Sequence, residues 1–316
     1  MSGIGNLMKN NIVIAIIGPT ASGKTETAIE LSKLIPSEVI SADSRQIYKY
    51  MDIGTAKPTK EELAAAKHHF IDIVNPDDYY SAGVFGNEAE NAALEIIGRS
   101  KIPVVAGGSG LYIKALCEGL FEEESEHKGS LGIRQELESE LKSNGIDILF
   151  DRLKNVDPVS AEKYIDKNPR RVLRALEYYL LSGKPISEAH ISTGQKPFVT
   201  YYYGIKTDRE ALYDRINKRA EIMWASGLIE ETKSLMNMGY SPSLNSMNTV
   251  GYKECIAYIE GKMPEPEALD KMKQATRNYA KRQMTWFRKI DKINWLEGSP
   301  KQIAQQIFRD LKTIIK

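Results

Sequence analysis

The stretch "GPTASGKT", residues 18–25, decides the fold because it matches the pattern G-x-x-x-x-G-K-[ST] at every fixed position. It follows the apolar run "NIVIAII" (11–17), and the spacing of "TETAIELSKLI" (25–35) behind it is typical of a helix. A buried strand, a glycine-rich turn and a helix in this order form a phosphate-binding loop, in which backbone N–H groups and the positive end of the helix face the anion. We therefore expect a ligand that carries phosphate groups.

Each part of this loop has an expected task. Lys24 supplies a point charge to an outer phosphate, and the hydroxyl of Thr25 is a candidate ligand of Mg²⁺. For Thr20 and Ser22, a role in loop geometry alone is an equally good interpretation. A kinase or another ATP-binding enzyme is the first interpretation of such a loop. The residues predicted to hold the phosphates are Gly18, Pro19, Thr20, Ala21, Ser22, Gly23, Lys24 and Thr25.

Strand and helix patterns alternate over much of the remaining chain. Further strands are expected at 38–42, 70–74, 102–110 and 201–208. This alternation is typical of parallel β-α-β units and predicts an α/β fold with a doubly wound parallel sheet. Between Phe121 and about residue 196 the pattern is helical, and the helix in "NPRRVLRALEYYLLSG" is expected to end at Gly183. We expect a P-loop core from residues 1–120 and 197–316 with C-terminal helices, and an inserted helical domain at 121–196.

Composition and charge exclude several classes of protein. Of 316 residues, 42% are hydrophobic and 27% charged, which is ordinary for a soluble globular protein. Cys117 and Cys255 lack the spacing of a disulfide framework or a zinc site. The start "MSGIGNLMKNN" does not resemble a secretory signal, and the apolar runs are shorter than the roughly 20 residues that span a bilayer. We expect a cytoplasmic protein with no membrane partner and no evident obligate protein partner.

Two further strand ends carry polar residues that a phosphate loop alone does not explain. Asp43 follows the expected strand at 38–42, and Ser109 lies in "AGGSG" (106–110). Doubly wound folds bind ligands at the carboxyl ends of their strands, so both side chains are expected to face the crevice of the loop. Asp43 is also the best candidate for the second Mg²⁺ anchor of an NTPase. A large second substrate could use the hydroxyl and the close backbone approach around Ser109.

The stretch "KMKQATRNYAKRQMTWFRK" (271–289) contains seven Lys or Arg residues and no acidic residue, with Tyr, Trp and Phe interleaved. Cations contact phosphates and aromatic rings stack on unpaired bases, so this pattern is typical of RNA binding. An amphipathic helix whose aromatic residues are buried explains it about equally well. A second basic run, "KNPRRVLR" (167–174), in a chain of net charge +1 favours a groove for a polyanion.

Six segments stand in the order in which a known family has them: "GPTASGKT", "SADSRQIYKYMDIGTAKPT" (41–59), "AGGSGLYIKAL" (106–116), "NPRRVLRALE" (168–177), "GYKE" (251–254) and "YAKRQMTWFRK" (279–289). Together they resemble the tRNA dimethylallyltransferases of the bacterial type, from about residue 12 to 290. The block "DSRQIY…DIGTAKP" is highly specific. The family also has an α/β core with a helical insertion, so the resemblance implies the same layout as the strand pattern does.

This resemblance implies transfer of the five-carbon group of dimethylallyl diphosphate to the N6 amine of the adenosine on the 3′ side of the anticodon. The amine is a poor nucleophile, so a carboxylate that accepts its proton assists the reaction, and Asp43 matches the base of the family. Lys24, the loop amides and Mg²⁺ at Thr25 would stabilise the charge on the leaving diphosphate. Arg219 matches an arginine that contacts the diphosphate. Ser109, where the family more often has threonine, would meet the tRNA near the reacting base.

The target base must leave its stack to react, which implies a pocket for it between the core and the helical domain. "SMNTVGYKE" is less basic than the same segment of many relatives. The residues implied to contact tRNA are Asp43, Ser44, Arg45, Gln46, Ser109, Lys167, Asn168, Pro169, Arg170, Arg171, Met247, Asn248, Thr249, Val250, Gly251, Tyr252, Lys281, Arg282, Gln283, Met284, Thr285, Trp286, Phe287 and Arg288.

Two other functions fit parts of the sequence. A small-molecule P-loop kinase, or a prenyltransferase acting on free adenine nucleotides, explains the loop but leaves the basic segments unused. An RNA-binding protein without catalytic activity, holding a nucleotide as a structural ligand, needs neither Asp43 nor Ser109 at a strand end. The expected partners are tRNA and dimethylallyl diphosphate, and the expected cofactor is Mg²⁺.

Overall fold

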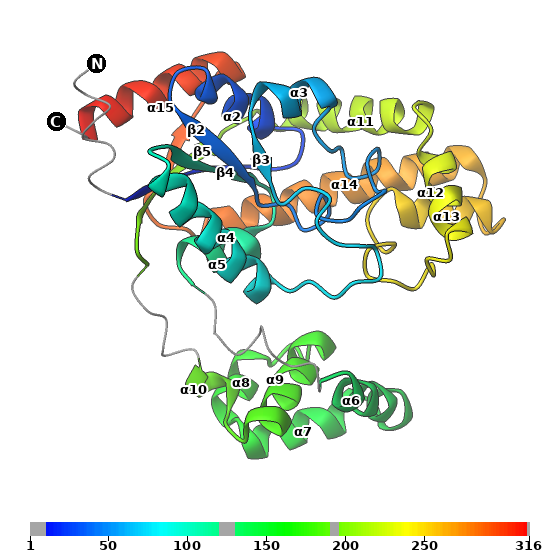
Figure 1. Ribbon diagram of the computed structural model, residues 1–316. Helices are drawn as coiled ribbons and strands as arrows, with labels where there is room; N and C mark the ends of the chain where they lie inside the picture. Colours follow the sequence, from blue (N-terminus) through cyan, green and yellow to red (C-terminus); the bar gives the residue numbers. More distant parts are fainter. Residues whose placement is uncertain (1–10, 120–129, 190–195, 315–316) are drawn as a thin grey trace. The chain divides into compact units, whose positions relative to one another are not determined.

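A parallel sheet of six strands forms the centre of the larger part of the molecule (Figure 1). The computed structural model describes residues 11–119, 130–189 and 196–314. Every strand pair is parallel, and the strand order is β3-β2-β4-β1-β5-β6. The strands are β1 (Ile12–Ile17), β2 (Ser37–Ser41), β3 (His68–His69), β4 (Ile102–Gly107), β5 (Val199–Ile205) and β6 (Asn294–Leu296). An α/β fold with a parallel sheet is thus confirmed.

The strand expected at 70–74 is wrong. The sheet contains only His68 and His69 in this region, and the chain then bends away. Phe70 and Asp72 have φ angles of 65° and 56°, in the left-handed region where a β-strand cannot continue. Val74 returns to an extended conformation only as an isolated bridge to Tyr48. The apolar residues of "FIDIV" therefore pack a turn against the 46–48 segment and do not extend the sheet.

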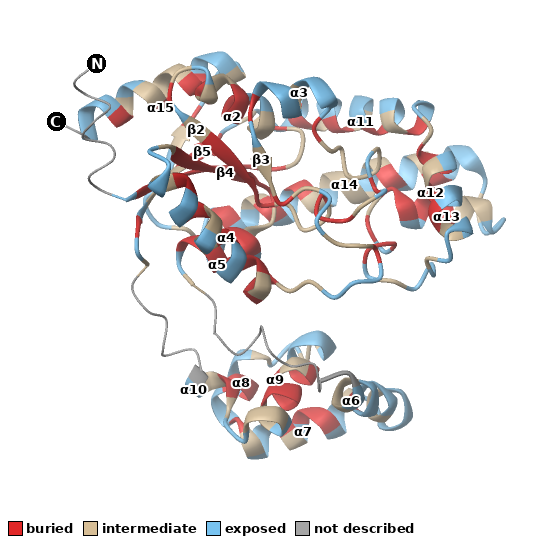
Figure 2. Ribbon diagram, in the orientation of Figure 1, coloured by how far each residue is buried: buried red, intermediate tan, exposed pale blue. Residues whose placement is uncertain are grey.

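Helices cover both faces of this sheet (Figure 1). Ile12, Ile14 and Ile16 of β1 belong to one buried cluster with residues of α2 (Lys24–Ser32) and α15 (Pro300–Ile314). Successive side chains of a strand point to opposite faces, so the intervening residues of β1 face the other side, where α4 (Ala82–Gly98) and α5 (Gly110–Cys117) lie. All six residues of β1 and of β4 are buried (Figure 2), as near-continuous apolar runs predict.

The remaining helices of this part extend from the carboxyl ends of the strands. They are α3 (Lys60–Ala65), α11 (Arg209–Ala225), α12 (Leu228–Asn237), α13 (Tyr252–Ile259) and α14 (Glu265–Phe287). Leu212 and Ile216 of α11 pack against Ala280 of α14, which holds these two long helices together. Among the described residues, no helix is both long and apolar enough to cross a membrane.

The chain divides into two compact units. Of the described residues, 11–80, 85–117 and 196–314 belong to the larger unit, and 81–84, 118–119 and 130–189 to the smaller one. The boundary expected at Phe121 falls outside the described residues. The helices of the smaller unit are α6 (Ser130–Asn144), α7 (Ile146–Val156), α8 (Pro158–Lys163), α9 (Pro169–Ser182) and α10 (Ile186–Ala189).

The smaller unit has its own apolar core. Leu149 and Leu153 of α7 and Leu176 of α9 are completely buried in one cluster. The carboxylate of Asp157, also completely buried, accepts hydrogen bonds from Ser160 N at 2.9 Å and Ser187 N at 3.0 Å, so that it caps the start of α8 and contacts α10. Helix α9 ends at Gly183 with a φ of 70°, as expected from the sequence.

Candidate functional site

The loop between β1 and α2 has the backbone conformation that its glycines permit. Gly23, directly before α2, has a φ of 89°, which favours glycine. A Cβ atom on Gly18 would lie 2.9 Å from Ser22 Oγ, so a side chain there would displace the loop. The buried hydroxyl of Ser22 has no hydrogen-bond partner among the described residues. Lys24 folds back over the loop, and its Nζ donates a hydrogen bond to Pro19 O at 2.7 Å.

The environment of Lys24 makes it unusually acidic. The pKa of this ammonium group is lowered to about 8. Burial is the main cause and Arg219 adds to it, while the nearby Asp43 carboxylate acts in the opposite direction. Burial removes water from the ammonium group and so disfavours its charge. A bound anion stabilises that charge in place of the lost water. Lys24 is thus placed to interact strongly with a phosphate.

A cavity of about 450 Å³, here called the loop cavity, lies beside this loop. Its walls include Lys24 and Thr25, the glycine-rich end of β4, and Arg219 from α11. Glu26, Glu62 and Asp43 are the acidic groups that act electrostatically on Arg219. The cavity therefore combines several cations with a few carboxylates, a composition suited to a highly charged anion and to a cation that accompanies it.

A second cavity of about 290 Å³, here called the side cavity, adjoins the first. Both cavities are lined by Thr20, Asp43, Thr55, Ala56, Arg219 and Tyr279. The side cavity extends between the segment 248–250 and the helices α11 and α14, where Met223 and Met272 contribute apolar surface. Asp43 thus lies on the wall that two spaces share, one rich in phosphate-binding groups and one whose lining has a larger apolar share.

The position of Asp43 is fixed by its neighbours. It lies two residues beyond the end of β2, and its Oδ1 accepts a hydrogen bond from Arg45 N at 2.9 Å. Ser109, at the end of β4, accepts a hydrogen bond from Ser44 N and donates one to Ser44 Oγ, both at 3.0 Å. The strands β2 and β4 are direct neighbours in the sheet, which brings these two strand ends together as expected. Arg45 is held away from Asp43 by a bond from its Nη1 to Asn245 O at 2.8 Å.

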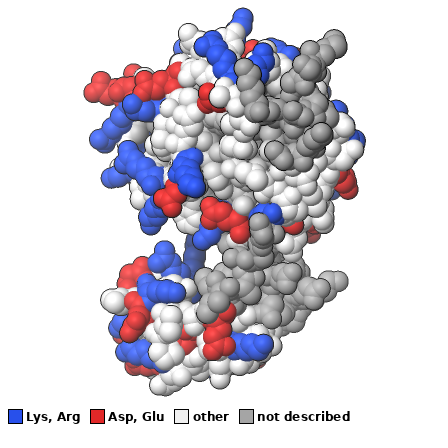
Figure 3. Space-filling view, turned by 90° about the vertical axis from the view of Figure 1, so that its left-hand side faces the viewer, with Lys and Arg blue, Asp and Glu red and all other residues white. Residues whose placement is uncertain are grey.

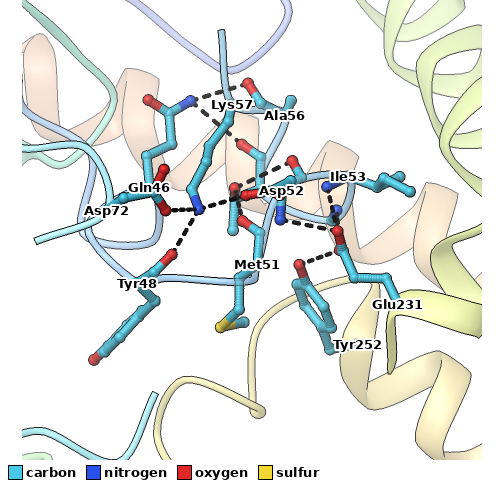
Figure 4. Close-up of polar contacts among 12 residues, drawn as sticks. Gln46, Tyr48, Met51, Asp52, Ile53, Ala56, Lys57, Asp72, Glu231 and Tyr252 are labelled. Carbon is cyan, nitrogen blue, oxygen red and sulfur yellow. Dashed lines mark hydrogen bonds and ion pairs between the residues drawn. The ribbon is translucent and has the colours of Figure 1, made fainter. Parts of the chain in front are cut away.

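The loop 52–57, which lines both cavities, is held by buried polar side chains (Figure 4). Gln46 accepts a hydrogen bond from Ser41 Oγ and donates one to Ala56 O, both at 3.0 Å. The ammonium group of Lys57 donates to Tyr48 O at 2.7 Å and pairs with Asp52 at 2.6 Å. Ala56 has a φ of 51°, a conformation that such contacts can hold in place. Gln46 was expected to contact tRNA, whereas its side chain is buried and shapes this loop.

Glu231 of α12 secures the other end of the same loop (Figure 4). Its Oε2 accepts hydrogen bonds from Asp52 N at 2.9 Å and Ile53 N at 2.8 Å, and its Oε1 accepts from Gly54 N at 3.1 Å. The hydroxyl of Tyr252 donates to the same Oε1 at 2.6 Å. A Cβ atom on Gly54 would lie 2.3 Å from the Tyr252 ring, so only glycine fits there. These four contacts, here called the Glu231 clamp, join "DIGTAKP" to the start of α13.

Several residues expected to contact tRNA have side chains that the structure uses for packing. Met247, Tyr252 and Phe287 are completely buried, so an RNA-contacting side chain is not supported at these positions. The sequence could not show this, because a buried aromatic residue and a stacking platform look alike without the helix phase. Arg282 and Trp286 of α14, in contrast, are exposed, Trp286 to 40%, and Arg282 also lines the side cavity.

The basic charge of α14 is concentrated near its end. Lys271 and Lys273, in its first half, pair with acidic residues. Lys281 and Arg288 are exposed and form no ion pair with an acidic residue in the part of the chain that the structure describes. Arg282 lies over the ring of Tyr279, 5.7 Å from its centroid. The candidate nucleic-acid surface of the larger unit is therefore the exposed end of this helix.

In the smaller unit, the basic run at the start of α9 is partly neutralised. Lys167 pairs with Asp147 at 2.6 Å, and Arg171 approaches Asp166 at 3.7 Å. Asn168 begins α9 by accepting hydrogen bonds from Arg170 N and Arg171 N, at 3.2 and 3.4 Å. On the face drawn in Figure 3, basic and acidic side chains are interspersed over this unit. The charge of this run is thus weaker than its sequence suggests.

The comparison with known proteins agrees with the grouping of these motifs. A family model described as IPP transferase matches residues 46–290. The chain belongs to the IPP transferase family. The tRNA dimethylallyltransferase of Acetivibrio thermocellus is 46% identical to it over 304 residues, which cover 95% of this chain and 96% of that protein. The corresponding enzyme of Alkaliphilus oremlandii is 43% identical over 310 residues, 96% of this chain and 98% of that protein.

Solved structures of IPP transferases have the same fold. The tRNA isopentenylpyrophosphate transferase of Bacillus halodurans superposes with a TM-score of 0.71 at 36% identity, covering 96% of this chain and 97% of that one. A eukaryotic dimethylallyltransferase described as acting on tRNA superposes with a TM-score of 0.78 at 30% identity, covering 91% of this chain and 74% of that one.

Proposed function

We propose that this protein transfers the dimethylallyl group of dimethylallyl diphosphate to the N6 amine of the adenosine on the 3′ side of the anticodon in tRNA, and that diphosphate leaves. The single observation that carries this proposal is the place of Asp43 on the common wall of the loop cavity and the side cavity. A base that faces two adjoining spaces can take a proton from an acceptor in one while the donor is held in the other. The names of the relatives support the substrate class.

In this proposal the loop cavity binds the diphosphate. Lys24 and Arg219 pair with its oxygens, while the N–H groups at the start of α2 offer hydrogen bonds. The N–H of Thr20 is already bonded to Gln283 Oε1 at 2.8 Å, so Thr20 serves the donor through its hydroxyl. The dimethylallyl carbon next to oxygen then points toward the side cavity, where the acceptor adenine lies.

The reaction is a substitution at carbon. The N6 lone pair of adenine forms the new bond to C1 of the donor, and the bond between C1 and the diphosphate oxygen breaks with its electron pair going to the diphosphate. The proton leaves N6 for the carboxylate of Asp43, which lowers the barrier for this poor nucleophile. Lys24 and Arg219 stabilise the charge that grows on the diphosphate.

The residues around the loop cavity fit Mg²⁺. The hydroxyl of Thr25 and the carboxylate of Glu26 line one cavity, and oxygen atoms are the ligands that Mg²⁺ prefers. Among the described residues, no group of three or more His, Cys, Asp or Glu side chains could hold a metal by itself. This suits an ion that is bound by one or two protein oxygens together with substrate phosphates. When bound, Mg²⁺ would neutralise part of the diphosphate charge.

Single-turnover transfer from labelled dimethylallyl diphosphate tests the proposal. The wild-type protein is incubated with an anticodon stem-loop RNA or with AMP, and Asp43→Ala is compared with Asp77→Ala, an exposed acidic residue outside both cavities. We expect transfer to the RNA, and a loss of about 100-fold or more in Asp43→Ala, the scale of a general base. Product on AMP alone would refute tRNA prenylation. A wild-type rate in Asp43→Ala would refute the role of this carboxylate.

A further inference from the structure

The side chain of Gln283, on α14, points into the protein and forms two hydrogen bonds there. Gln283 is only 5% exposed, although it lies within the basic stretch 271–289. Its Oε1 accepts a hydrogen bond from Thr20 N in the phosphate loop at 2.8 Å, and its Nε2 donates one to Gly108 O at 2.9 Å. The carboxamide therefore bridges the carboxyl ends of β1 and β4, which are neighbouring strands.

The backbone at Gly108 is built to admit this carboxamide. A Cβ atom on Gly108 would lie 2.2 Å from Gln283 Nε2, while its next neighbours, Gln283 Cδ and Lys24 Nζ, would be 3.4 and 3.9 Å away. The φ angle of Gly108 is not in the left-handed region, so the approach of Gln283 is the feature of this position that favours glycine. The glycine and the glutamine thus form one unit.

The bridge is continuous with the groups that hold Asp43. Ser109 directly follows Gly108 and bonds both Ser44 N and Ser44 Oγ, next to Asp43 in the chain. Tyr279, one turn before Gln283 on α14, lines both cavities together with Asp43, and burial raises its pKa to about 12. The hydrogen bonds of Gln283 and those of Ser109 are therefore joined through the backbone between Gly108 and Ser109, and together they connect the phosphate loop to the turn beside Asp43.

The outer side of the same helix carries the exposed residues of the candidate nucleic-acid surface. Lys281 and Arg282 are exposed directly before Gln283, and the ring of Trp286 packs where Gly110 has no side chain, 2.2 Å from the position of a Cβ atom there. One helical turn thus faces the phosphate loop on one side and solvent on the other. An RNA bound to the exposed residues of α14 would therefore contact the same helix that reaches the phosphate loop.

We propose that Gln283 is a positioning residue, which sets the spacing between the phosphate loop and Asp43 from the helix that carries the RNA-facing cations. This inference rests on the proposed function. Gln283 takes no part in proton transfer. It fixes the phosphate loop, and with it the donor, so that C1 of the donor and the carboxylate of Asp43 both lie next to the N6 atom of adenine. A small displacement of reacting groups lowers the rate strongly.

The first test replaces the carboxamide by a side chain of similar shape without hydrogen bonds. Gln283→Met is compared with Gln274→Met, a change of the same kind at an exposed position of α14 outside both cavities. Losing two hydrogen bonds at the site is expected to lower the single-turnover rate at saturating donor and RNA by about tenfold or more. The dissociation constant of the anticodon stem-loop, measured at fixed salt, is expected to stay within about twofold, because the RNA-facing cations are intact.

The second test approaches the bridge from its other end. Gly108→Ala drives the added Cβ atom into Gln283 Nε2, so it is expected to reproduce the loss of rate in the wild-type background. In the Gln283→Ala background the clash is gone, and the same substitution is expected to cost less than about twofold, because the two changes act on one interaction. Thermal unfolding of all variants shows that each one is folded.

These measurements separate failure of the inference from failure of the proposed function. If the wild-type protein transfers the dimethylallyl group to RNA while Gln283→Met has an unchanged rate, the positioning role is refuted. It is also refuted if Gly108→Ala keeps its full effect in the Gln283→Ala background, since the methyl group would then act on the cavity itself. Absence of transfer by the wild-type protein refutes the proposed function instead.

Discussion

The Glu231 clamp provides the most demanding prediction about the structure. Replacing Glu231 by alanine leaves three backbone N–H groups and the Tyr252 hydroxyl without their acceptor. Asp52 is exposed, so water can satisfy its N–H, whereas the ring of Tyr252 is completely buried and Ile53 and Gly54 are only partly accessible. Hydrogen bonds to a charged acceptor contribute about 1.5 to 3 kcal/mol each, and partial hydration offsets some of this, so we expect a loss of about 3 to 5 kcal/mol.

More conservative substitutions divide this energy into parts. Tyr252→Phe removes one hydrogen bond and is expected to cost about 1 to 2 kcal/mol. Glu231→Gln keeps one oxygen acceptor but turns an NH₂ group toward Gly54 N–H and the Tyr252 hydroxyl. The tyrosine can rotate its hydrogen and accept from this group, but Gly54 N–H cannot. Glu231→Gln is therefore expected to fall between the alanine variant and Tyr252→Phe.

Thermal unfolding of the larger unit, followed by circular dichroism, measures these differences. A loss of 3 to 5 kcal/mol corresponds to a lowering of Tm by about 6 to 12 °C in a chain of this size. Glu230→Ala is the matched control, since Glu230 is the exposed neighbour on the same helix turn. A Tm for Glu231→Ala equal to that of Glu230→Ala would show that the clamp contributes no stability. Additive effects of Glu231→Ala and Tyr252→Phe would show that the two side chains do not interact.

Three further predictions follow from single residues. Because burial lowers the pKa of Lys24 to about 8, the kcat/KM for the diphosphate donor is expected to fall as the pH rises through about 8, and Lys24→Arg is expected to abolish this decline in a pH–rate profile. Gly107→Ala places a Cβ atom 2.1 Å from Ala42 O and is expected to cost about 2 kcal/mol or more in denaturant unfolding, whereas Gly98→Ala, which meets no atom within 4 Å, is expected to be neutral or stabilising. Burial raises the pKa of Glu38, but hydrogen bonds from His69, Lys101, Arg99 and Lys67 outweigh it and hold that pKa well below 4.5. The free energy of unfolding lost in Glu38→Gln is therefore expected to be largest near neutral pH and to shrink as the pH falls below about 4.5.

Local patterns in the sequence predicted the parts of the site that are local in the chain. The strand, loop and helix around residues 12–32 follow one another directly, so the motif shows their arrangement. Asp43 and Ser109 could be placed together because parallel neighbouring strands end at the same edge of a sheet. The end of α9 at Gly183 depended on a single residue with a known preference.

The contacts that organise the site join residues far apart in the chain, and the sequence could not predict them. Gln283 bonds Thr20 across 263 positions, and Glu231 bonds Ile53 across 178. A glutamine in a basic stretch and a glutamate on an amphipathic helix are both common on solvated surfaces, so neither residue stands out without the fold. Gly108 and Gly54 are the sequence features related to these contacts. Gln283 approaches Gly108 closely and the Tyr252 ring approaches Gly54, but the sequence does not show which neighbour leaves no room for a side chain.

A phosphate loop does not decide which bond of its ligand breaks. Cleavage of a phosphorus–oxygen or of a carbon–oxygen bond leaves negative charge on a phosphate oxygen, and Lys24 and the helix end stabilise that charge in either reaction. The difference lies on the opposite wall. A kinase would need an acceptor hydroxyl beside the outermost phosphate, whereas here Asp43 lies on the common wall of the loop cavity and the side cavity, and apolar methionine side chains line the side cavity. Under the proposed function, what commits this loop to alkyl transfer is therefore the place of Asp43 between the two cavities. The Gln283 bridge lies beside the phosphate loop, and the Glu231 clamp holds the loop 52–57, which lines both cavities.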